Sequence, residues 1–189
     1  MLAGIEAARA VGFEELKINT VVLRDDNDDE LPAIVEWAWA RGIVPRFIEL
    51  MHIGEGAKLA PEKLVGHDEM RGRLAHLLAD HPGEREANRG PAKYVSARRD
   101  PTLRVGFITG TTDTYCDTCD RLRVASDGAL RPCLATNDGV DAMALAETGD
   151  VPGLVKAIGE AWALKPDGRT WKGCTEETAA DVSMRAIGG

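Results

Sequence analysis

The sequence is poor in the features that nucleic-acid-binding and membrane proteins use. Aromatic residues make up only 5%, too few for a platform on which bases stack. Acidic residues outnumber basic ones by 31 to 23, so the net charge is −8, and no basic block stands out beyond Arg98-Arg99. No apolar run approaches the roughly 20 residues needed to cross a bilayer, and the start of the chain lacks the pattern of a signal peptide. We therefore expect a cytoplasmic protein without nucleic-acid or membrane partners.

Cysteine is also scarce, but its placement is informative. Three of the four cysteines follow the pattern Cys116-x2-Cys119-x13-Cys133. In a chain without export signals, such clustering favours metal binding over disulfides. With 189 residues, of which 44% are hydrophobic, the chain can form one domain, or one domain plus part of another.

The first 51 residues predict a βαβ unit. The expected elements are a helix over 2–12, a strand over 16–23, a helix to about residue 41 and a strand over 43–51. Asp28 or Asp29 is the expected cap of the second helix, and Pro32 suits its first turn. Such units build parallel sheets, so a lone unit whose strands have unpaired outer edges suggests that part of a larger sheet is missing.

The rest of the chain predicts a mixture of helices and antiparallel strands. The expected elements are a Gly/Pro/Lys-rich connection over 54–63, a helix over 67–80, a loop over 81–92 and two helices between 139 and 165. Four short strands, over 93–98, 104–109, 121–125 and 129–134, are expected to form one antiparallel sheet. Asp127-Gly128 predicts a tight hairpin turn between the last two.

The hairpin would carry Cys133 back towards the knuckle formed by Cys116 and Cys119. Three thiolates are one ligand short of a closed site. The pattern alone leaves two interpretations open. One is a structural zinc site, with Cys174 as a candidate fourth ligand; the other is an iron–sulfur cluster with one iron free to take a substrate atom.

Charged residues near the cysteines and in the early strands are candidate ligand contacts. Arg121 and Arg123, two apart on a strand, share a face and could bind an anion in a forked geometry; the alternative is a solvated face paired with Asp120 or Asp127. Lys17, Asn19 and Arg46 interrupt strands that should be apolar. Buried polar groups must be paired or serve a ligand, unless Lys17 reaches water at the strand start.

Four separated segments, in one order, resemble the GTP 3′,8-cyclases of molybdenum cofactor biosynthesis, a family of the radical S-adenosylmethionine superfamily. The segments are Lys17-Ile18-Asn19-Thr20, Arg46-Phe47-Ile48-Glu49-Leu50-Met51, the run from Gly106 through Tyr115, Cys116, Cys119, Arg121, Arg123 and Asp127-Gly128 to Cys133-Leu134, and Met184-x-x-Ile187-Gly188-Gly189. The resemblance favours iron–sulfur over zinc.

The resemblance implies roles for individual residues. It implies a [4Fe–4S] cluster on Cys116, Cys119 and Cys133, whose fourth iron contacts the guanine of GTP. It further implies GTP contacts from Lys17, Arg121 and Arg123, an S-adenosylmethionine contact from Met51, and active-site contacts from Asn19, Arg46, Gly188 and Gly189. Cys174 receives no role.

The resemblance covers only the family's C-terminal half, because the CxxxCxxC motif of a first [4Fe–4S] cluster is not in this sequence. It implies an α/β fold in which residues 1–55 are the last βαβ part of an incomplete radical-SAM (β/α) barrel. Residues 56–189 would be an α+β second-cluster domain with antiparallel strands and a diglycine tail.

In the family, a radical derived from S-adenosylmethionine takes the 3′ hydrogen of GTP, and the product, 3′,8-cyclo-7,8-dihydro-GTP, passes to cyclic pyranopterin monophosphate synthase. We expect this chain to be inactive unless an N-terminal half is supplied in trans. An open barrel edge would favour pairing with that half or formation of a homodimer. The alternatives are a zinc-stapled, non-catalytic interaction module and a guanine-nucleotide-binding regulator.

Overall fold

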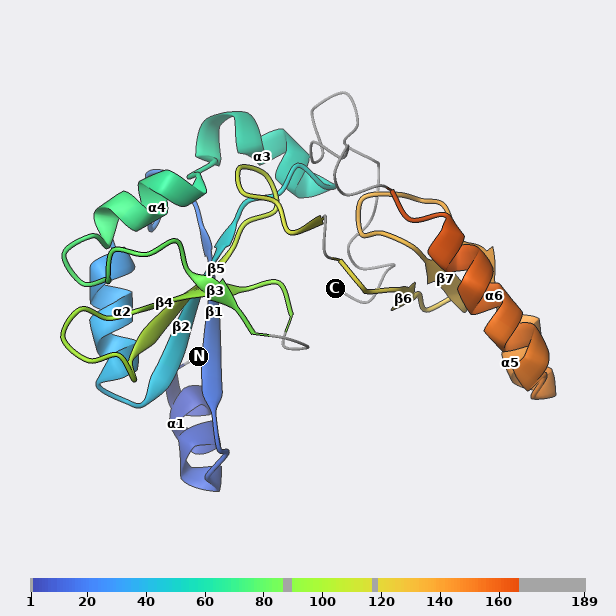
Figure 1. Cartoon of the computed structure of the whole chain (residues 1–189), viewed down its shortest axis with the longest axis horizontal. Coiled ribbons are helices and arrows are strands. Elements are labelled where there is room, and N and C mark those ends of the chain that lie inside the picture. Colours follow the sequence, from blue (N-terminus) through green and yellow to red (C-terminus); the bar gives the residue numbers. More distant parts are fainter. Residues whose placement is uncertain (1, 87–89, 117–118, 167–189) are drawn as a thin grey trace. The chain divides into compact units, whose positions relative to one another are not determined.

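A computed structural model describes residues 2–86, 90–116 and 119–166, and these form a mixed α/β structure of two compact units (Figure 1). Unit 1 comprises the described parts of 1–50 and 62–113, and unit 2 those of 51–61 and 114–189. The family domain boundary expected near residue 55 stays a prediction. No helix among the described residues is both long and apolar enough to cross a membrane.

Unit 1 is built on a mixed sheet of five strands in the order β1-β2-β5-β4-β3. The strands are β1 (Leu16–Val22), β2 (Ile43–Glu49), β3 (Glu84–Arg85), β4 (Lys93–Ser96) and β5 (Arg104–Ile108). β2 runs parallel to both β1 and β5, whereas β4 is antiparallel to β5 and to β3. The predicted βαβ unit is therefore present, but its barrel context stays a prediction.

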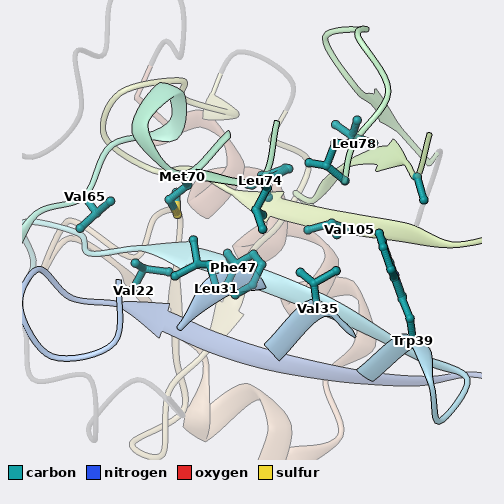
Figure 2. Packing of buried hydrophobic residues seen from close by; sticks show 13 residues of the cluster. Val22, Leu31, Val35, Trp39, Phe47, Val65, Met70, Leu74, Leu78 and Val105 are labelled. Carbon is teal, nitrogen blue, oxygen red and sulfur yellow. The ribbon is translucent and has the colours of Figure 1, made fainter. Parts of the chain in front are cut away.

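One face of this sheet is covered by helices and forms the core of unit 1 (Figure 2). The helices are α2 (Leu31–Trp39) and α4 (His67–Arg73). In β2 every second side chain is buried, as expected of a strand with one covered face. Phe47 and Phe107 are register partners on β2 and β5 and lie at the centre of this core, 6.3 Å apart between ring centroids.

The expected cap of α2 was wrong. The helix begins after Glu30, which makes no side-chain capping bond, although Pro32 lies in the first turn as predicted. Asp28 accepts instead from the backbone N–H of Asp25, at 2.8 Å, and from the Arg73 guanidinium, at 2.5 Å. The ion pair with Arg73 uses the carboxylate that a cap would require.

Two further helix predictions were wrong. The expected connection over 54–63 is a helix, α3 (Glu55–Lys63). The helix expected over 67–80 ends at Arg73, because the backbone beyond it pairs with the end of β4: the N–H of Ala79 donates to Ser96 and that of Arg98 to Leu77. The expected loop over 81–92 contains the short strand β3, whereas α1 (Leu2–Val11) was predicted correctly.

The expectation of one antiparallel sheet from four short strands was also wrong. β4 and β5 are antiparallel to each other, but β5 extends the β1–β2 sheet in parallel. The outer edge of β2 is therefore paired, whereas among the described residues no strand pairs with the other side of β1. The Phe107 ring packs beside the Phe47 ring, and this contact favours pairing of β5 with β2 over pairing with the cysteine hairpin.

Unit 2 contains a second sheet, in the order β6-β7-β8. Its elements are β6 (Arg123–Val124), β7 (Ala129–Arg131), β8 (Val140–Asp141), α5 (Met143–Thr148) and α6 (Val151–Ala163). The small side chains of Ala157 and Ala161 on α6 let the helix approach Leu130 of β7 closely. Asp150 caps α6 by accepting from the Gly153 N–H at 3.0 Å. The two predicted C-terminal helices are confirmed.

Candidate metal and anion site

The hairpin that precedes Cys133 forms as predicted. Arg123 pairs with Arg131 across it, and the turn is closed by the N–H of Gly128 donating to Ala125 at 3.0 Å. Gly128 has φ +79°, which glycine adopts without strain, and the Asp127 carboxylate accepts from the N–H of Ala129. Cys133 lies two residues after the end of β7, in the same unit as Cys116 and Cys119.

At the knuckle, the N–H of Cys119 donates to the carbonyl of Cys116 at 3.3 Å. Cys116, Cys119 and Cys133 form no disulfide among the described residues, and all three are half-buried. Thiols that are not oxidised to disulfides can act as metal ligands.

Cys119 lies in a cationic environment. Lys165 donates from Nζ to its sulfur at 3.6 Å. Burial alone would raise the pKa of the Cys119 thiol, but hydrogen bonds from the backbone and guanidinium of Arg121, together with the charges of Arg121 and Lys165, outweigh burial and lower it. This site favours a thiolate, the form that binds metals.

Tyr115 connects Arg121 to Met51. The Arg121 guanidinium lies 5.0 Å from the centroid of the Tyr115 ring, a cation–π contact. The phenol donates to the sulfur of Met51 at 3.9 Å, and burial raises the Tyr115 pKa despite the nearby arginine. Arg121 is thus positioned by both Tyr115 and Cys119.

Met51 and Cys133 pack in the same small apolar cluster, around Ile53 and Ala135. The Cys133 sulfur also accepts from the N–H of Ala135 at 3.5 Å. Met51, the predicted S-adenosylmethionine contact, therefore packs in the same apolar group as Cys133, a predicted iron–sulfur ligand. The role of Met51 was predicted only from the resemblance.

Within residues 2–86, 90–116 and 119–166, no three His, Cys, Asp or Glu side chains are gathered closely enough to hold a metal ion. The chemistry of the donor set nevertheless fits an iron–sulfur cluster. Cys116, Cys119 and Cys133 form no disulfide with one another, and nearby cations stabilise the thiolate form of Cys119. The ligand assignment stays a prediction.

The Arg123 guanidinium has no polar partner in the part of the chain that the structure describes. It makes no hydrogen bond or ion pair with another described residue, and neither it nor Arg121 pairs with Asp120 or Asp127 in that part of the chain. The nearest acid of the turn, Asp127, faces Arg131 at 4.0 Å. Among the described residues, Asp120 and Asp127 therefore do not neutralise Arg121 and Arg123.

The candidate residues of unit 1 lie on the sheet face opposite the core. Asn19 and Arg46 are register partners, and the Arg46 Nε donates to the side-chain Oδ1 of Asn19 at 2.8 Å. Lys17 is mostly buried and pairs with Glu15 at 2.6 Å, so it does not simply extend into water. Gly106 on β5 is the register partner of Arg46 on its other side. A Cβ at Gly106 would lie only 2.8 Å from the Arg46 Cγ, so the Arg46 stem packs directly over this glycine.

Some predicted positions could not be compared, and some contacts were missed. Gly188, Gly189 and Cys174 lie outside the described residues. Sequence reasoning gave no role to Lys165, because a lysine after a helix carries no signal of its own. Tyr115 was part of the quoted motif, but nothing in its sequence context predicted its contacts with Arg121 and Met51.

Fold and site together define a mixed α/β protein with a cysteine-bearing hairpin unit in which cations flank a thiol. The family model described as Molybdenum Cofactor Synthesis C matches residues 43–171. The chain belongs to this family.

Several relatives of the chain carry the name GTP 3′,8-cyclase. It is 41% identical to "GTP 3′,8-cyclase 1" of Pseudomonas aeruginosa over 171 residues, covering 88% of this chain and 51% of the relative. It is 34% identical to GTP 3′,8-cyclase of Caulobacter vibrioides over 192 residues, covering 100% of this chain and 54% of the relative. For GTP 3′,8-cyclase of Pelotomaculum thermopropionicum the identity is 37%, over 87% of this chain and 51% of the relative. The chain thus spans about half the length of these relatives.

Proposed function

We propose that the chain is the C-terminal part of a GTP 3′,8-cyclase acting in molybdenum cofactor biosynthesis. Its part in the reaction is to hold a second [4Fe–4S] cluster and to bind GTP. The observation that carries the proposal is the cationic setting of Cys119, where Arg121 and Lys165 stabilise a thiolate in a half-buried position. The names of the relatives support the pathway.

Cys116, Cys119 and Cys133 would hold the cluster through their thiolates. When bound, a cluster with three protein ligands supplies one iron that can accept a nitrogen or oxygen of the substrate. The hydrogen bonds from Lys165 to Cys119 and from Ala135 to Cys133 direct two of the sulfurs and keep their lone pairs oriented.

Arg121 and Arg123 would bind the anionic GTP. Guanidinium groups present donors in a planar fork that matches phosphate oxygens. The ring of Tyr115 holds Arg121 in place, and Arg123 has no competing carboxylate among the described residues. Lys17 is assigned to GTP, and Met51 to S-adenosylmethionine, on the resemblance. Asn19 and Arg46 are assigned active-site contacts, which their mutual hydrogen bond supports by fixing the guanidinium.

The radical step of the complete enzyme requires a first cluster, and its CxxxCxxC motif is not in this sequence. We therefore propose that the chain binds GTP and its own cluster but releases no deoxyadenosine when mixed with GTP, S-adenosylmethionine and dithionite.

The test is anaerobic reconstitution of the full chain with iron and sulfide. We expect about four irons per chain, lost when Cys116, Cys119 or Cys133 is replaced by serine. One tightly bound zinc and no stable iron would instead support the zinc-stapled module and refute the proposal.

GTP binding is tested separately by calorimetry on the reconstituted protein. Charge-assisted hydrogen bonds contribute about 1.5–3 kcal/mol, so replacing both Arg121 and Arg123 by alanine should weaken binding at least 100-fold. Arg9→Ala is the matched control and should bind GTP normally, because Arg9 lies on α1 and contacts only surface groups, the Glu6 carboxylate at 2.6 Å and the Arg41 carbonyl at 3.2 Å. Equal affinity in all three proteins would remove GTP from the proposal.

A further inference from the structure

Lys165 connects the two chain segments that carry Cys119 and Cys133. Its Nζ donates to the carbonyl of Arg121 at 2.8 Å, to the carbonyl of Pro132 at 2.9 Å and to the sulfur of Cys119 at 3.6 Å. Arg121 follows the knuckle by two residues, and Pro132 directly precedes Cys133. One ammonium group thus reaches both segments, which are separated by the whole hairpin.

The chemistry of lysine suits this position. An ammonium has three N–H donors, and here all three have an acceptor. Lys165 directly follows Leu164, the C-cap of α6, and a helix C-terminus favours a cation. The Trp162 ring, with its centroid 5.4 Å from Nζ, flanks the ammonium. The group is held from several sides and is not a solvated surface lysine.

We infer that Lys165 is a positioning residue for the cluster ligands: it ties the Cys119 and Cys133 segments together and donates a hydrogen bond to the Cys119 sulfur. The inference rests on the proposed function for the identity of the bound group. The tie itself is a property of the metal-free chain. Hydrogen bonds to ligand sulfurs also stabilise the reduced cluster, so the contact should raise its reduction potential.

Three variants of the full chain test the inference after anaerobic reconstitution. Lys165→Met removes the donors but keeps most of the stem, and Lys165→Arg keeps the charge. Lys156→Met is the matched control, because Lys156 lies on α6, the helix that ends just before Lys165, is exposed and pairs only weakly with Glu160, at 3.6 Å. Iron release to a chelator, the midpoint potential and hydrogen exchange of the metal-free proteins are measured.

We expect Lys165→Met to release iron about 10 to 100 times faster than the unaltered chain, the usual effect of losing a group that orients a metal ligand. Its midpoint potential should be more negative. Lys165→Arg should restore much of the potential but less of the retention, because a planar guanidinium cannot reach three acceptors arranged around a point. Lys156→Met should match the unaltered chain throughout.

Hydrogen exchange of the metal-free chain tests the Lys165 inference independently of the proposed function. In the metal-free chain, Lys165→Met should speed exchange of the amides of 119–123 and 133–135, with little change elsewhere in unit 2. If the unaltered chain binds no iron, the proposed function fails, and these amides still decide whether Lys165 ties the segments. Unchanged exchange, or iron release within twofold of the unaltered chain, would overturn the inference.

Discussion

Glu49 is the only fully buried carboxylate in the described core, and it fastens the loop that leads to the knuckle. It lies at the end of β2, with none of its surface exposed. Its carboxylate accepts from the N–H of Thr111 at 2.7 Å, from the N–H of Thr112 at 3.0 Å and from the Thr112 hydroxyl at 2.6 Å. Replacing Glu49 by alanine should therefore free residues 111–112 from the sheet.

The size of the effect follows from these bonds. A hydrogen bond to a charged acceptor contributes about 1.5–3 kcal/mol, so three bonds set an upper limit of about 9 kcal/mol. The net loss is smaller, because Thr112 is exposed and its freed donors can bind water, and because the cost of burying the charge is also removed. We expect Glu49→Ala to lower the free energy of unfolding by about 2–3 kcal/mol. Glu49→Gln, which retains one acceptor, should cost about 1–2 kcal/mol.

Hydrogen exchange at the amides of Thr111 and Thr112 gives the local measurement, and denaturant unfolding gives the global one. A loss of about 2–3 kcal/mol corresponds to roughly 30- to 160-fold faster exchange at both amides. Glu36→Ala, on the exposed face of α2, is the control and should change stability by less than about 0.5 kcal/mol. Glu49→Ala behaving like Glu36→Ala would show that the three bonds do not hold the loop.

Three further predictions concern other features of the fold. Hydrogen bonds from Arg24 and then Arg73 lower the pKa of Glu69 to about 2. The stabilisation by the Glu69 carboxylate is therefore complete above the ordinary pKa of 4.5 and is lost as the pH falls towards 2. Because both side chains of the Arg24–Glu69 pair are more than a third exposed, Glu69→Gln should remove only about 1 kcal/mol of this acid-dependent stability, measured by denaturation curves at pH 3 and 6. Gly106→Val should lower the melting temperature, because even a Cβ would lie 2.8 Å from the Arg46 Cγ, at a cost of about 1–3 kcal/mol; an unchanged melting temperature would contradict the tight packing. Gly128→Ala should cost about 1–2 kcal/mol and speed iron release, since φ is +79° there; normal iron retention would show that the turn does not govern Cys133.

Features with a local cause were predicted correctly from the sequence. The β1 and β2 strands, Pro32 in the first turn of α2 and the turn at Gly128 each depend on residues within a few positions of one another. The sequence pattern repeats in these segments at the period of the element, or carries the residue that a turn requires. Tertiary contacts then reinforce the local preference rather than oppose it.

Features with a distant cause were missed. β5 joined the first sheet because Phe107 packs beside Phe47, and the helix after His67 stopped at Arg73 because Leu77 and Ala79 pair with the end of β4. The predicted cap at Asp28 also failed for a distant reason, because the Asp28 carboxylate pairs with the guanidinium of Arg73, 45 residues away. No window of sequence contains both members of these pairs, so periodicity could not have predicted them.

The overall charge of the chain is opposite in sign to the charge around Cys119. The net charge of −8 suggests a surface that repels anions. Yet Arg121 and Lys165 both lie against Cys119, and Arg123 follows two residues later without a carboxylate partner among the described residues. At physiological ionic strength exposed charges are largely screened beyond about 8 Å, so a ligand beside Cys119 responds chiefly to these cations and little to the remote acidic surface. An acidic chain can therefore bind a polyphosphate, because the sign of the local field is set by the few residues that fold around the site.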